Sequence, residues 1–248
     1  MIPRLKILGE RNSGTTYLQQ LLAANVQATL LPGTAPPLWR RLARGREWPI
    51  DLYFRLSARS NLGWKHQLAA PPARVCPAHH ARPRVAFVII TKNPYAWLLS
   101  LFRHPYHYQS QLSDFETFLR QPWATVAREN HPQPFANPIE LWNAKHQAYE
   151  QLARHCPCLL LRYEDLLADP AREIRRIAQQ FNLRQNSPFT PIRASAKGES
   201  HKDFSFYQDY YLAQRWRQAL SQAQIHLINR TLNPQTVAAM GYSMLPSS

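Results

Sequence analysis

Eight residues near the start of the chain, Gly9–Thr16 (GERNSGTT), have the composition and spacing of a loop that binds phosphate. They follow the short apolar segment Leu5–Leu8, and the next segment, Thr15–Ala24, has apolar residues at helical spacing. In the P-loop pattern G-x-x-x-x-G-K-[ST], backbone N–H groups and a helix N-terminus hold a phosphate. Both glycines and the last threonine are present, but Thr15 occupies the lysine position. We therefore predict a phosphate site without the ammonium group that contacts the terminal phosphates of ATP.

A second anion site is predicted at the end of Val85–Thr91 (VAFVIIT), the strongest strand pattern in the sequence. A continuous run of apolar and β-branched residues is typical of a strand buried on both faces. Lys92 follows this strand directly, and Pro94 then opens a helix that runs to about Arg103. Ser100 lies eight residues after Lys92, on roughly the same side of the structure. A cation at a strand end beside a helix N-terminus is suited to bind an anion.

Strands and helices are predicted to alternate along the chain, which is typical of a mainly parallel sheet covered on both faces. In the first half of the chain we also expect an extended connection with a helical turn or two at 31–61 and a strand entering a loop at 62–67. In the second half we expect a helix at 139–154, a buried strand at 158–162 and a helix at 170–181. A polar loop at 185–205 is then predicted before two final helices. The predicted fold class is therefore α/β, a three-layer sandwich with a central, mainly parallel sheet, in a single domain over residues 1–248.

The composition indicates a protein that attracts anions. Thirty basic and fifteen acidic residues give a formal net charge of +15, and such a field concentrates anions near the surface. No apolar stretch approaches the roughly 18 residues of a membrane span. Arg4 and Lys6 lie early in the chain, but the apolar run behind them is too short for a secretory signal. We therefore expect a cytoplasmic protein with no membrane span, and we interpret its three cysteines as buried thiols.

The first loop resembles that of a known family. Ser13–Leu18 (SGTTYL) is similar to the phosphosulfate loop of sulfotransferases, P-K-[ST]-G-T-[TS]-[WY]-L. Asn12 occupies the position of the family's lysine, so Arg11 becomes the candidate substitute, because a guanidinium can contact two oxyanions at once. Lys92 and Ser100 match an arginine and a serine that bind the 3′-phosphate of the family's sulfuryl donor, PAPS (3′-phosphoadenylyl sulfate).

Further segments extend this resemblance from about residue 5 to residue 242. Tyr163–Pro170 (YEDLLADP) resembles the family segment Y-E-D-[LM]-x-x-[DN]-P, and the end of the chain resembles the usual C-terminal helix and L-G-Y. Lys197, in Ala196-Lys197-Gly198, is similar to a late lysine-glycine pair that also contacts the 3′-phosphate. The resemblance implies a P-loop NTPase-like sulfotransferase fold.

The resemblance also implies which residues carry the chemistry. Sulfuryl transfer needs cations around the transferred group and benefits from a base that takes the acceptor's proton. The family places a lysine and a histidine in K-x-H order, and Lys65-His66 is similar without the spacer. His66 is therefore expected to be the general base and Lys65 a donor to the leaving oxygen, with Glu10 as the alternative base. Neighbours on an extended strand point to opposite faces, so both can serve only if the backbone turns there.

The resemblance thus predicts a PAPS-dependent sulfotransferase that needs no metal ion. Its acceptor would be a hydroxyl or amine on a small molecule or a glycan, and no specific nucleic acid partner is expected. The predicted catalytic residues are His66, Lys65 and Arg11, and the predicted donor-binding residues are Arg11, Asn12, Ser13, Gly14, Thr15, Thr16, Lys92, Ser100 and Lys197.

Three other classes of protein remain open at this point. A P-loop kinase or NTPase would need the missing lysine and acidic Mg²⁺ ligands. A catalytically degenerate protein of the same fold would bind nucleotide or polyanion without transfer, as Asn12 suggests. A basic module that binds RNA or an acidic polymer would fit the charge, but it leaves both predicted anion sites unexplained.

Overall fold

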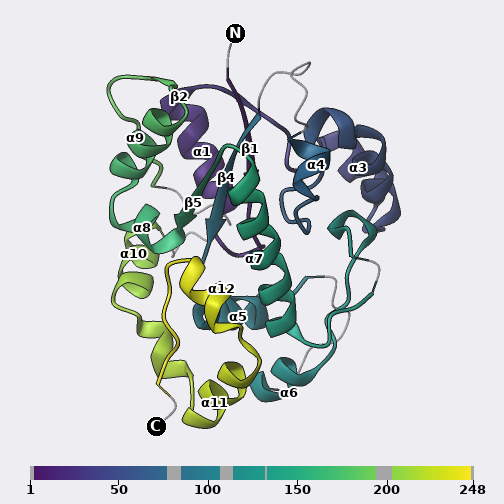
Figure 1. Cartoon of the computed structure of the whole chain (residues 1–248), viewed down its shortest axis with the longest axis vertical. Coiled ribbons are helices and arrows are strands. Elements are labelled where there is room, and N and C mark those ends of the chain that lie inside the picture. Colours follow the sequence, from purple (N-terminus) through teal and green to yellow (C-terminus); the bar gives the residue numbers. More distant parts are fainter. Residues whose placement is uncertain (1–2, 77–84, 107–113, 132, 194–202, 247–248) are drawn as a thin grey trace.

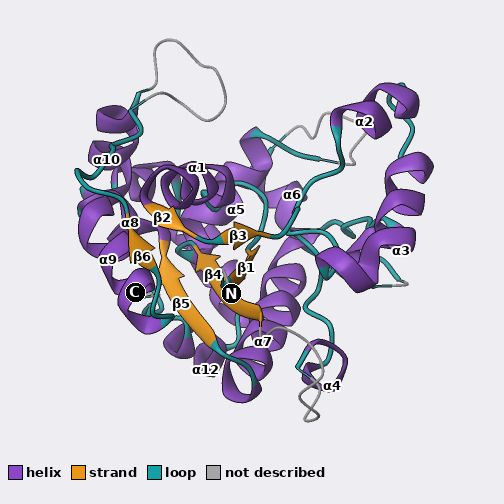
Figure 2. Cartoon of the chain, turned by 90° about the horizontal axis from the view of Figure 1, so that it is seen from above, coloured by secondary structure: helices purple, strands orange, loops and turns teal. Residues whose placement is uncertain are grey.

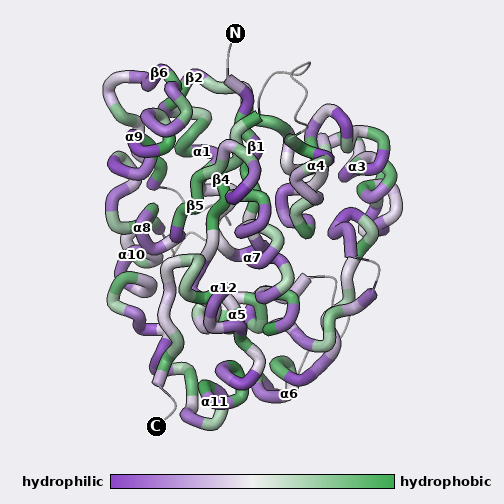
Figure 3. Tube along the Cα trace, in the orientation of Figure 1, coloured by the Kyte–Doolittle hydropathy of each residue, from purple (hydrophilic) through white to green (hydrophobic). Residues whose placement is uncertain are grey.

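Parallel strands form the centre of the protein in a computed structural model that describes residues 3–76, 85–106, 114–131, 133–193 and 203–246. The four-stranded sheet has the order β3 (Thr29–Leu30), β1 (Arg4–Leu8), β4 (Val85–Thr91), β5 (Cys158–Arg162), and every neighbouring pair is parallel. The central strands lie side by side in Figure 1, and Figure 3 shows hydrophobic residues along β4. The predicted strands at 85–91 and 158–162 are confirmed.

Both faces of the sheet are buried, as the continuous apolar pattern of β4 predicts. Phe87 and Ile89 pack in a cluster with residues of α7 (Pro138–His155). Val88 and Ile90 point to the other face, where the cluster contains residues of α1 (Thr15–Asn25) and α9 (Pro170–Gln180). Figure 2 shows α1 and α9 on one side of the strands and α7 with α12 (Pro234–Ala239) on the other. The predicted α/β class with a mainly parallel central sheet is therefore confirmed.

The carboxyl ends of three neighbouring strands meet at one edge of this sheet, where ligands bind in α/β folds. The loop at 9–14 leads from β1 into α1, Lys92 leads from β4 into α5 (Pro94–Arg103), and β5 leads directly into α8 (Tyr163–Ala168). The segments predicted to bind anions therefore converge although they lie far apart in the sequence.

The segment 31–61 does not form the predicted extended connection. It contains two helices, α2 (Pro37–Ala43) and α3 (Trp48–Asn61), and each has a proline in its first turn. Their inner faces pack in a small separate cluster with Ala35 and Trp64. Large apolar residues on the outer faces hide the helical periodicity, so the pattern reads as irregular. Figure 2 shows both helices well away from the sheet.

The predicted strand at 62–67 is also wrong. Leu62 and Gly63 adopt left-handed backbone conformations, with φ of 59° and 84°, and a turn follows at Lys65 and His66. A strand cannot continue through left-handed residues, so the chain bends at this point.

The interpretation of all three cysteines as thiols is wrong for two of them. Cys76 and Cys156 form a disulfide that joins residues 80 positions apart, a separation that hides the pairing from the sequence. Cys158 remains a thiol, and burial raises its pKa to about 12.

The remaining elements lie around this core. They are α4 (Pro72–Val75), α6 (Phe115–Arg120), α10 (Phe204–Leu212), α11 (Gln222–Thr231), 3-10 turns at Ala127–Glu129 and Arg215–Ala219, and a small antiparallel pair of β2 (Val26–Gln27) with β6 (Arg184–Gln185). Within the described ranges, no helix has the length and apolar character needed to cross a membrane.

Candidate functional site

The loop after β1 presents backbone N–H groups without a side-chain cap. Gly14 is the N-cap of α1 and has a left-handed φ of 88°. Among the described residues no side chain caps this helix, whereas α5, α7 and α9 are capped by Asn93, Asn137 and Asp169. The first N–H groups of a helix have no partner inside the helix, so those of α1 are available to an anion.

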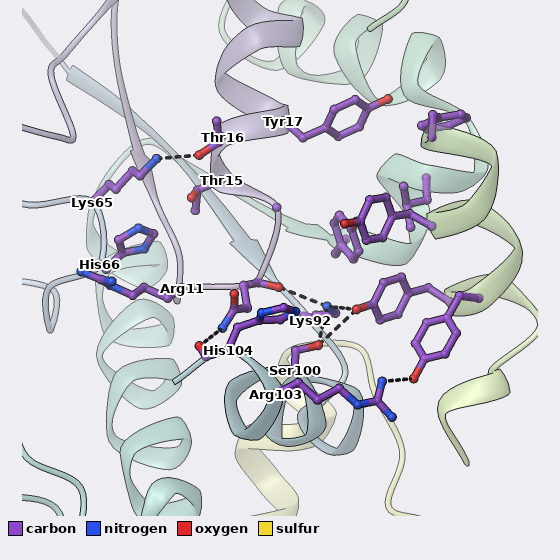
Figure 4. Close-up of a pocket in the computed structure, with 18 of the residues that line it drawn as sticks. Arg11, Thr15, Thr16, Tyr17, Lys65, His66, Lys92, Ser100, Arg103 and His104 are labelled. Atoms are coloured by element: carbon purple, nitrogen blue, oxygen red, sulfur yellow. Dashed lines mark hydrogen bonds between the residues drawn. The ribbon is translucent and has the colours of Figure 1, made fainter. Parts of the chain in front are cut away.

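A cavity of about 510 Å³ opens beside this loop and collects most of the predicted site residues. Figure 4 shows Lys65 and His66 on one side of it and Lys92 and Ser100 on another. The predicted residues that line the cavity are Arg11, Asn12, Gly14, Thr15, Thr16, Lys65, His66, Lys92 and Ser100. Ser13 does not line it, because its buried hydroxyl donates to the carbonyl of Glu10 within the loop. Lys197 lies outside the described residues.

The turn at Lys65 and His66 lies against the phosphate loop. The Gly9 N–H donates to the Lys65 carbonyl at 3.0 Å, and the Lys65 N–H donates to the Gly33 carbonyl at 3.1 Å. Lys65 Nζ donates to Thr16 Oγ1 at 3.2 Å. Burial, with Arg11 nearby, lowers the pKa of Lys65 to about 8. The backbone therefore turns where it must for both side chains to reach one cavity.

The tautomer of His66 follows from its hydrogen bond. His66 Nδ1 lies 2.6 Å from the Gly9 carbonyl oxygen, which can only accept, so Nδ1 carries the proton. The other ring nitrogen, Nε2, is then the atom with a lone pair. Burial lowers the pKa of His66 well below its ordinary value, and Lys65 lowers it further. The ring is therefore neutral at neutral pH with its lone pair at Nε2, and the same burial makes it a weaker base than a free imidazole.

Arg11 lies between aromatic rings at the edge of the cavity. Its guanidinium carbon is 4.3 Å from the Tyr106 ring centroid and 5.0 Å from that of Trp64. Burial lowers its pKa. Arg11 Nε is buried without a hydrogen-bond partner in the described part of the chain. A guanidinium carries further N–H donors besides Nε, and these are suited to an anionic ligand in the cavity that Arg11 lines.

Lys92 is the second buried cation of the cavity. Its Nζ donates to the Asn12 carbonyl at 3.1 Å, to Ser100 Oγ at 3.1 Å and to the Tyr211 hydroxyl at 2.5 Å. These three acceptors carry no formal charge. Burial lowers the pKa of Lys92 to about 7, although Glu164 acts in the opposite direction. The predicted pairing of Lys92 with Ser100 is present in the structure.

An aromatic wall from α10 completes the cavity, and none of its residues was predicted from the sequence to belong to the site. The lining side chains of this helix are Phe204, Phe206, Tyr207, Tyr210 and Tyr211. Arg103 Nη1 donates to the Tyr210 hydroxyl at 2.8 Å, and His104 also lines the cavity. The dense run of aromatic residues from 204 to 211 was the available signal. Aromatic faces are suited to stack on a planar base.

Glu10, the alternative base, lies behind the loop and does not line the cavity. Its Oε1 is 2.7 Å from Lys145 Nζ, and its Oε2 accepts from the Tyr106 hydroxyl at 3.0 Å. Lys145 Nζ also contacts Glu129 Oε2 at 3.0 Å. Lys145, Glu10 and Glu129 are almost completely buried. These contacts give Glu10 a scaffolding role in the described structure.

Two buried lysines hold the segment that carries Lys65 and His66. Lys6 Nζ donates to the carbonyls of Asn61 at 2.7 Å and Pro32 at 2.9 Å, and also to that of Gly63. Lys145 Nζ donates to the His66 carbonyl at 2.6 Å. The segment is thus anchored at both ends by side chains from β1 and α7.

This arrangement defines a class of protein. A parallel sheet with an uncapped phosphate-type loop after one strand and a buried cation after its neighbour is an α/β fold of the P-loop type. Within the described residues, no group of three or more His, Cys, Asp or Glu side chains is placed to hold a metal ion.

Comparison with known proteins identifies the family. The model of the sulfotransferase domain family matches residues 3–232, and the chain belongs to this family. No curated protein matches the chain. The solved structures similar to it include a sulfotransferase domain from the curacin biosynthetic pathway, 13% identical over 99% of each chain with a TM-score of 0.49. Another is a sulfotransferase from Alicyclobacillus acidocaldarius, 14% identical over 88% of this chain and 99% of the other, with a TM-score of 0.46.

Proposed function

We propose that this sulfotransferase domain transfers a sulfuryl group from PAPS to a hydroxyl or amine, such as one on a glycan. The observation that carries the proposal is that the loop around Gly14 and the Lys92–Ser100 pair line one cavity. PAPS carries phosphate at both the 5′ and 3′ positions, so it needs two anion sites that are held apart. The proposal treats residues 1–248 as one domain and requires no metal ion.

The residues of the cavity fit such a donor. The N–H groups around Gly14 would hold the 5′-phosphate, and Lys92 with Ser100 would hold the 3′-phosphate, which restores the charge that burial disfavours on Lys92. In the transfer, the bond from sulfur to the 5′-phosphate oxygen breaks as a bond to the acceptor oxygen or nitrogen forms. Lys65 and Arg11 would stabilise charge on the leaving oxygen, and His66 Nε2 would take the acceptor's proton.

Calorimetry with adenosine 3′,5′-bisphosphate, ATP and single-stranded RNA tests the binding part. We expect the bisphosphate to bind and the other two ligands to bind much more weakly. A transfer assay with radiolabelled PAPS across glycans, lipids, phenols and peptides tests the reaction. No measurable affinity for the bisphosphate would overturn the proposal.

A binding protein without transfer is the second candidate, because Asn12 replaces the family's lysine. Its amide Nδ2 donates to the His104 carbonyl at 3.3 Å, so this group already has a hydrogen-bond partner within the protein. Bisphosphate binding with no transfer to any acceptor class would favour this candidate. Arg11, one residue earlier, supports the catalytic alternative because it lines the cavity and its guanidinium can contact two oxyanions at once.

Gly14→Ala is expected to weaken bisphosphate binding by about tenfold or more. A Cβ at this position would lie 2.4 Å from the Tyr163 ring, and φ is 88°, so the loop must shift. Gly45→Ala is the matched control, since Gly45 has φ of 81° but no heavy atom within 4 Å of the added Cβ. The control carries only the backbone cost of about 1 kcal/mol in stability. Calorimetry on both variants checks this prediction, and equal affinities would contradict it.

Lys92→Met is expected to weaken binding of adenosine 3′,5′-bisphosphate by roughly 10- to 100-fold, the value of a charge-assisted hydrogen bond. Binding of adenosine 5′-monophosphate, which lacks the 3′-phosphate, should be unchanged. Titration of both nucleotides into both proteins checks this. An equal loss for the two nucleotides would show that Lys92 does not recognise the 3′-phosphate.

The affinity for the bisphosphate is expected to fall as pH rises above 7. The free protein holds Lys92 at a pKa of about 7, and a bound phosphate raises that pKa because it stabilises the charged form. Binding above pH 7 must therefore include proton uptake, whereas Lys92 adds no pH dependence well below 7. Calorimetry in buffers of different ionisation enthalpy measures the uptake. Lys92→Met should remove the part of the uptake that belongs to Lys92, and Lys65, with a pKa of about 8, accounts for the remainder. Identical uptake in the variant would contradict the assignment.

A further inference from the structure

The outer faces of α2 and α3 expose large apolar side chains. Within the described ranges, the exposed large hydrophobic residues on these helices are Leu38 (64% exposed), Leu42 (61%), Trp48 (61%) and Leu56 (69%). The other such residues, Phe206 and Leu212, lie on α10 and are less exposed. Most of the exposed apolar side chains therefore gather on one helical hairpin.

Together with the half-buried Leu52, these side chains make one row on each helix, and we name the two rows the α2–α3 outer face: Leu38, Leu42, Trp48, Leu52 and Leu56. Leu38 and Leu42 are four residues apart on α2, and Trp48, Leu52 and Leu56 follow the same spacing on α3. Residues four apart lie on the same side of a helix.

The inner faces of α2 and α3, unlike the outer face, are packed inside the protein. Trp39, Tyr53 and Phe54 pack with Ala35 and Trp64 in their own cluster. The two helices therefore have a core, and the outer face is additional apolar surface. Figure 3 shows hydrophobic and hydrophilic residues interspersed along α3 at the edge of the molecule.

Exposed arginines occur throughout the same two helices and their connection. Residues 36–61 contain six arginines and no lysine, and all six side chains are exposed: Arg40, Arg41, Arg44, Arg46, Arg55 and Arg59. The acidic residues of this segment are Glu47 and Asp51, and both pair with Arg128 at 2.6 and 2.7 Å. The positive charge of the outer face is therefore not neutralised by its own carboxylates.

We propose that the α2–α3 outer face docks on an anionic phospholipid membrane. The leucines and Trp48 would enter the boundary between headgroups and acyl chains, and the guanidinium groups would contact lipid phosphates with paired hydrogen bonds. Tryptophan is enriched at this depth of a bilayer. A second copy of this chain is a poorer occupant, since a symmetric contact would place arginines against arginines.

Sedimentation with phosphatidylcholine vesicles, with and without phosphatidylglycerol, tests the proposal. We expect the full chain to bind only the vesicles that contain phosphatidylglycerol, and added salt should weaken this binding. Bromine-labelled acyl chains should quench the fluorescence of Trp48, and Trp48→Phe should remove that quenching. No binding to the anionic vesicles, or binding without quenching, would overturn the proposal.

Two variants separate the contribution of positive charge to vesicle binding from the contribution of apolar insertion. Replacing Arg41, Arg55 and Arg59 by Gln is expected to lower vesicle affinity by about 100-fold, at roughly 1 kcal/mol for each arginine. Replacing Leu38, Leu42 and Leu56 by Ser should lower it by about tenfold or more, since apolar burial is lost.

The matched control replaces Arg175, Arg184 and Arg230 by Gln, which removes the same charge from exposed positions on α9, β6 and α11. An equal loss in the control would show that net charge alone causes binding, and would overturn the proposal. Equal affinity of the unaltered protein for heparin and for anionic vesicles, with the leucine variant unaffected, would assign the face to an acidic polymer instead. Bisphosphate binding measured on each variant reports the nucleotide site separately, so the two proposals can fail independently.

Discussion

Lys145→Met is expected to lower the free energy of unfolding by about 3–5 kcal/mol, the cost of removing one partner from a buried ionic group. Lys145 Nζ lies 2.7 Å from Glu10 Oε1 and 3.0 Å from Glu129 Oε2, and none of these side chains is exposed. Without the ammonium, two buried carboxyl groups would face each other with no cation between them. Urea unfolding followed by circular dichroism measures the change.

The pH dependence identifies the cause of this loss. Burial raises the pKa of Glu129, and Lys145 opposes that rise. In the variant the pKa must rise further, so the folded state binds a proton more tightly than the unfolded state does. Stability then falls as pH rises above the unfolded pKa, and the loss should be larger at pH 8 than at pH 5.

A triple variant serves as the control for this prediction. Lys145→Met combined with Glu10→Gln and Glu129→Gln removes the uncompensated charges, so it should recover much of the lost stability. It also keeps the test informative if the single variant does not fold. A loss that is independent of pH and is not recovered by the triple variant would show that packing, and not charge, is the cause.

Lys65→Ala is expected to lower turnover by about 10²–10³-fold, the effect of removing one donor aimed at developing charge. Lys65 Nζ lines the cavity and donates to Thr16 Oγ1 in the first turn of α1. Its contribution would be made in the transition state, so kcat should fall more than KM changes. Steady-state kinetics with PAPS and any acceptor found by the transfer screen would measure both constants.

The charge of Lys65 provides the control. Its pKa is about 8 in the free protein and the bound donor would raise it, so turnover that depends on the ammonium should decline only as pH rises above that value. Lys65→Arg keeps a positive charge at all these pH values and should remove the alkaline decline, even if its geometry is less favourable. An alanine variant with unchanged kcat and raised KM would instead assign Lys65 to donor binding.

Much of the fold could be predicted from local sequence patterns. The apolar run at 85–91 predicted a strand buried on both faces, and the glycines and threonines at 9–16 predicted a loop between a strand and a helix. The pairing of Lys92 with Ser100 was implied by the family resemblance and agrees with the spacing of eight residues along the chain. These predictions held because each depends on residues that are close in sequence, where backbone preference and periodicity act directly.

The candidate site could be predicted only in part, because it is built from residues that are far apart in the sequence. Whether Lys65 and His66 reach one cavity depends on left-handed residues at 62–63 and on carbonyl contacts with Lys6 and Lys145. The aromatic wall of α10 joins the cavity from the far end of the chain.

The sequence by itself determined the parallel strands, the loop at 9–16 between a strand and a helix, and the position of Lys92 directly after a strand, because each of these depends on near neighbours. Only the tertiary structure decided the burial of Glu10 with Lys145, the disulfide between Cys76 and Cys156, and the two helices within 31–61. The first two depend on contacts between distant segments, and the two helices depend on packing in their own cluster. Such packing outweighs local propensity because burial contributes more free energy than backbone preference does.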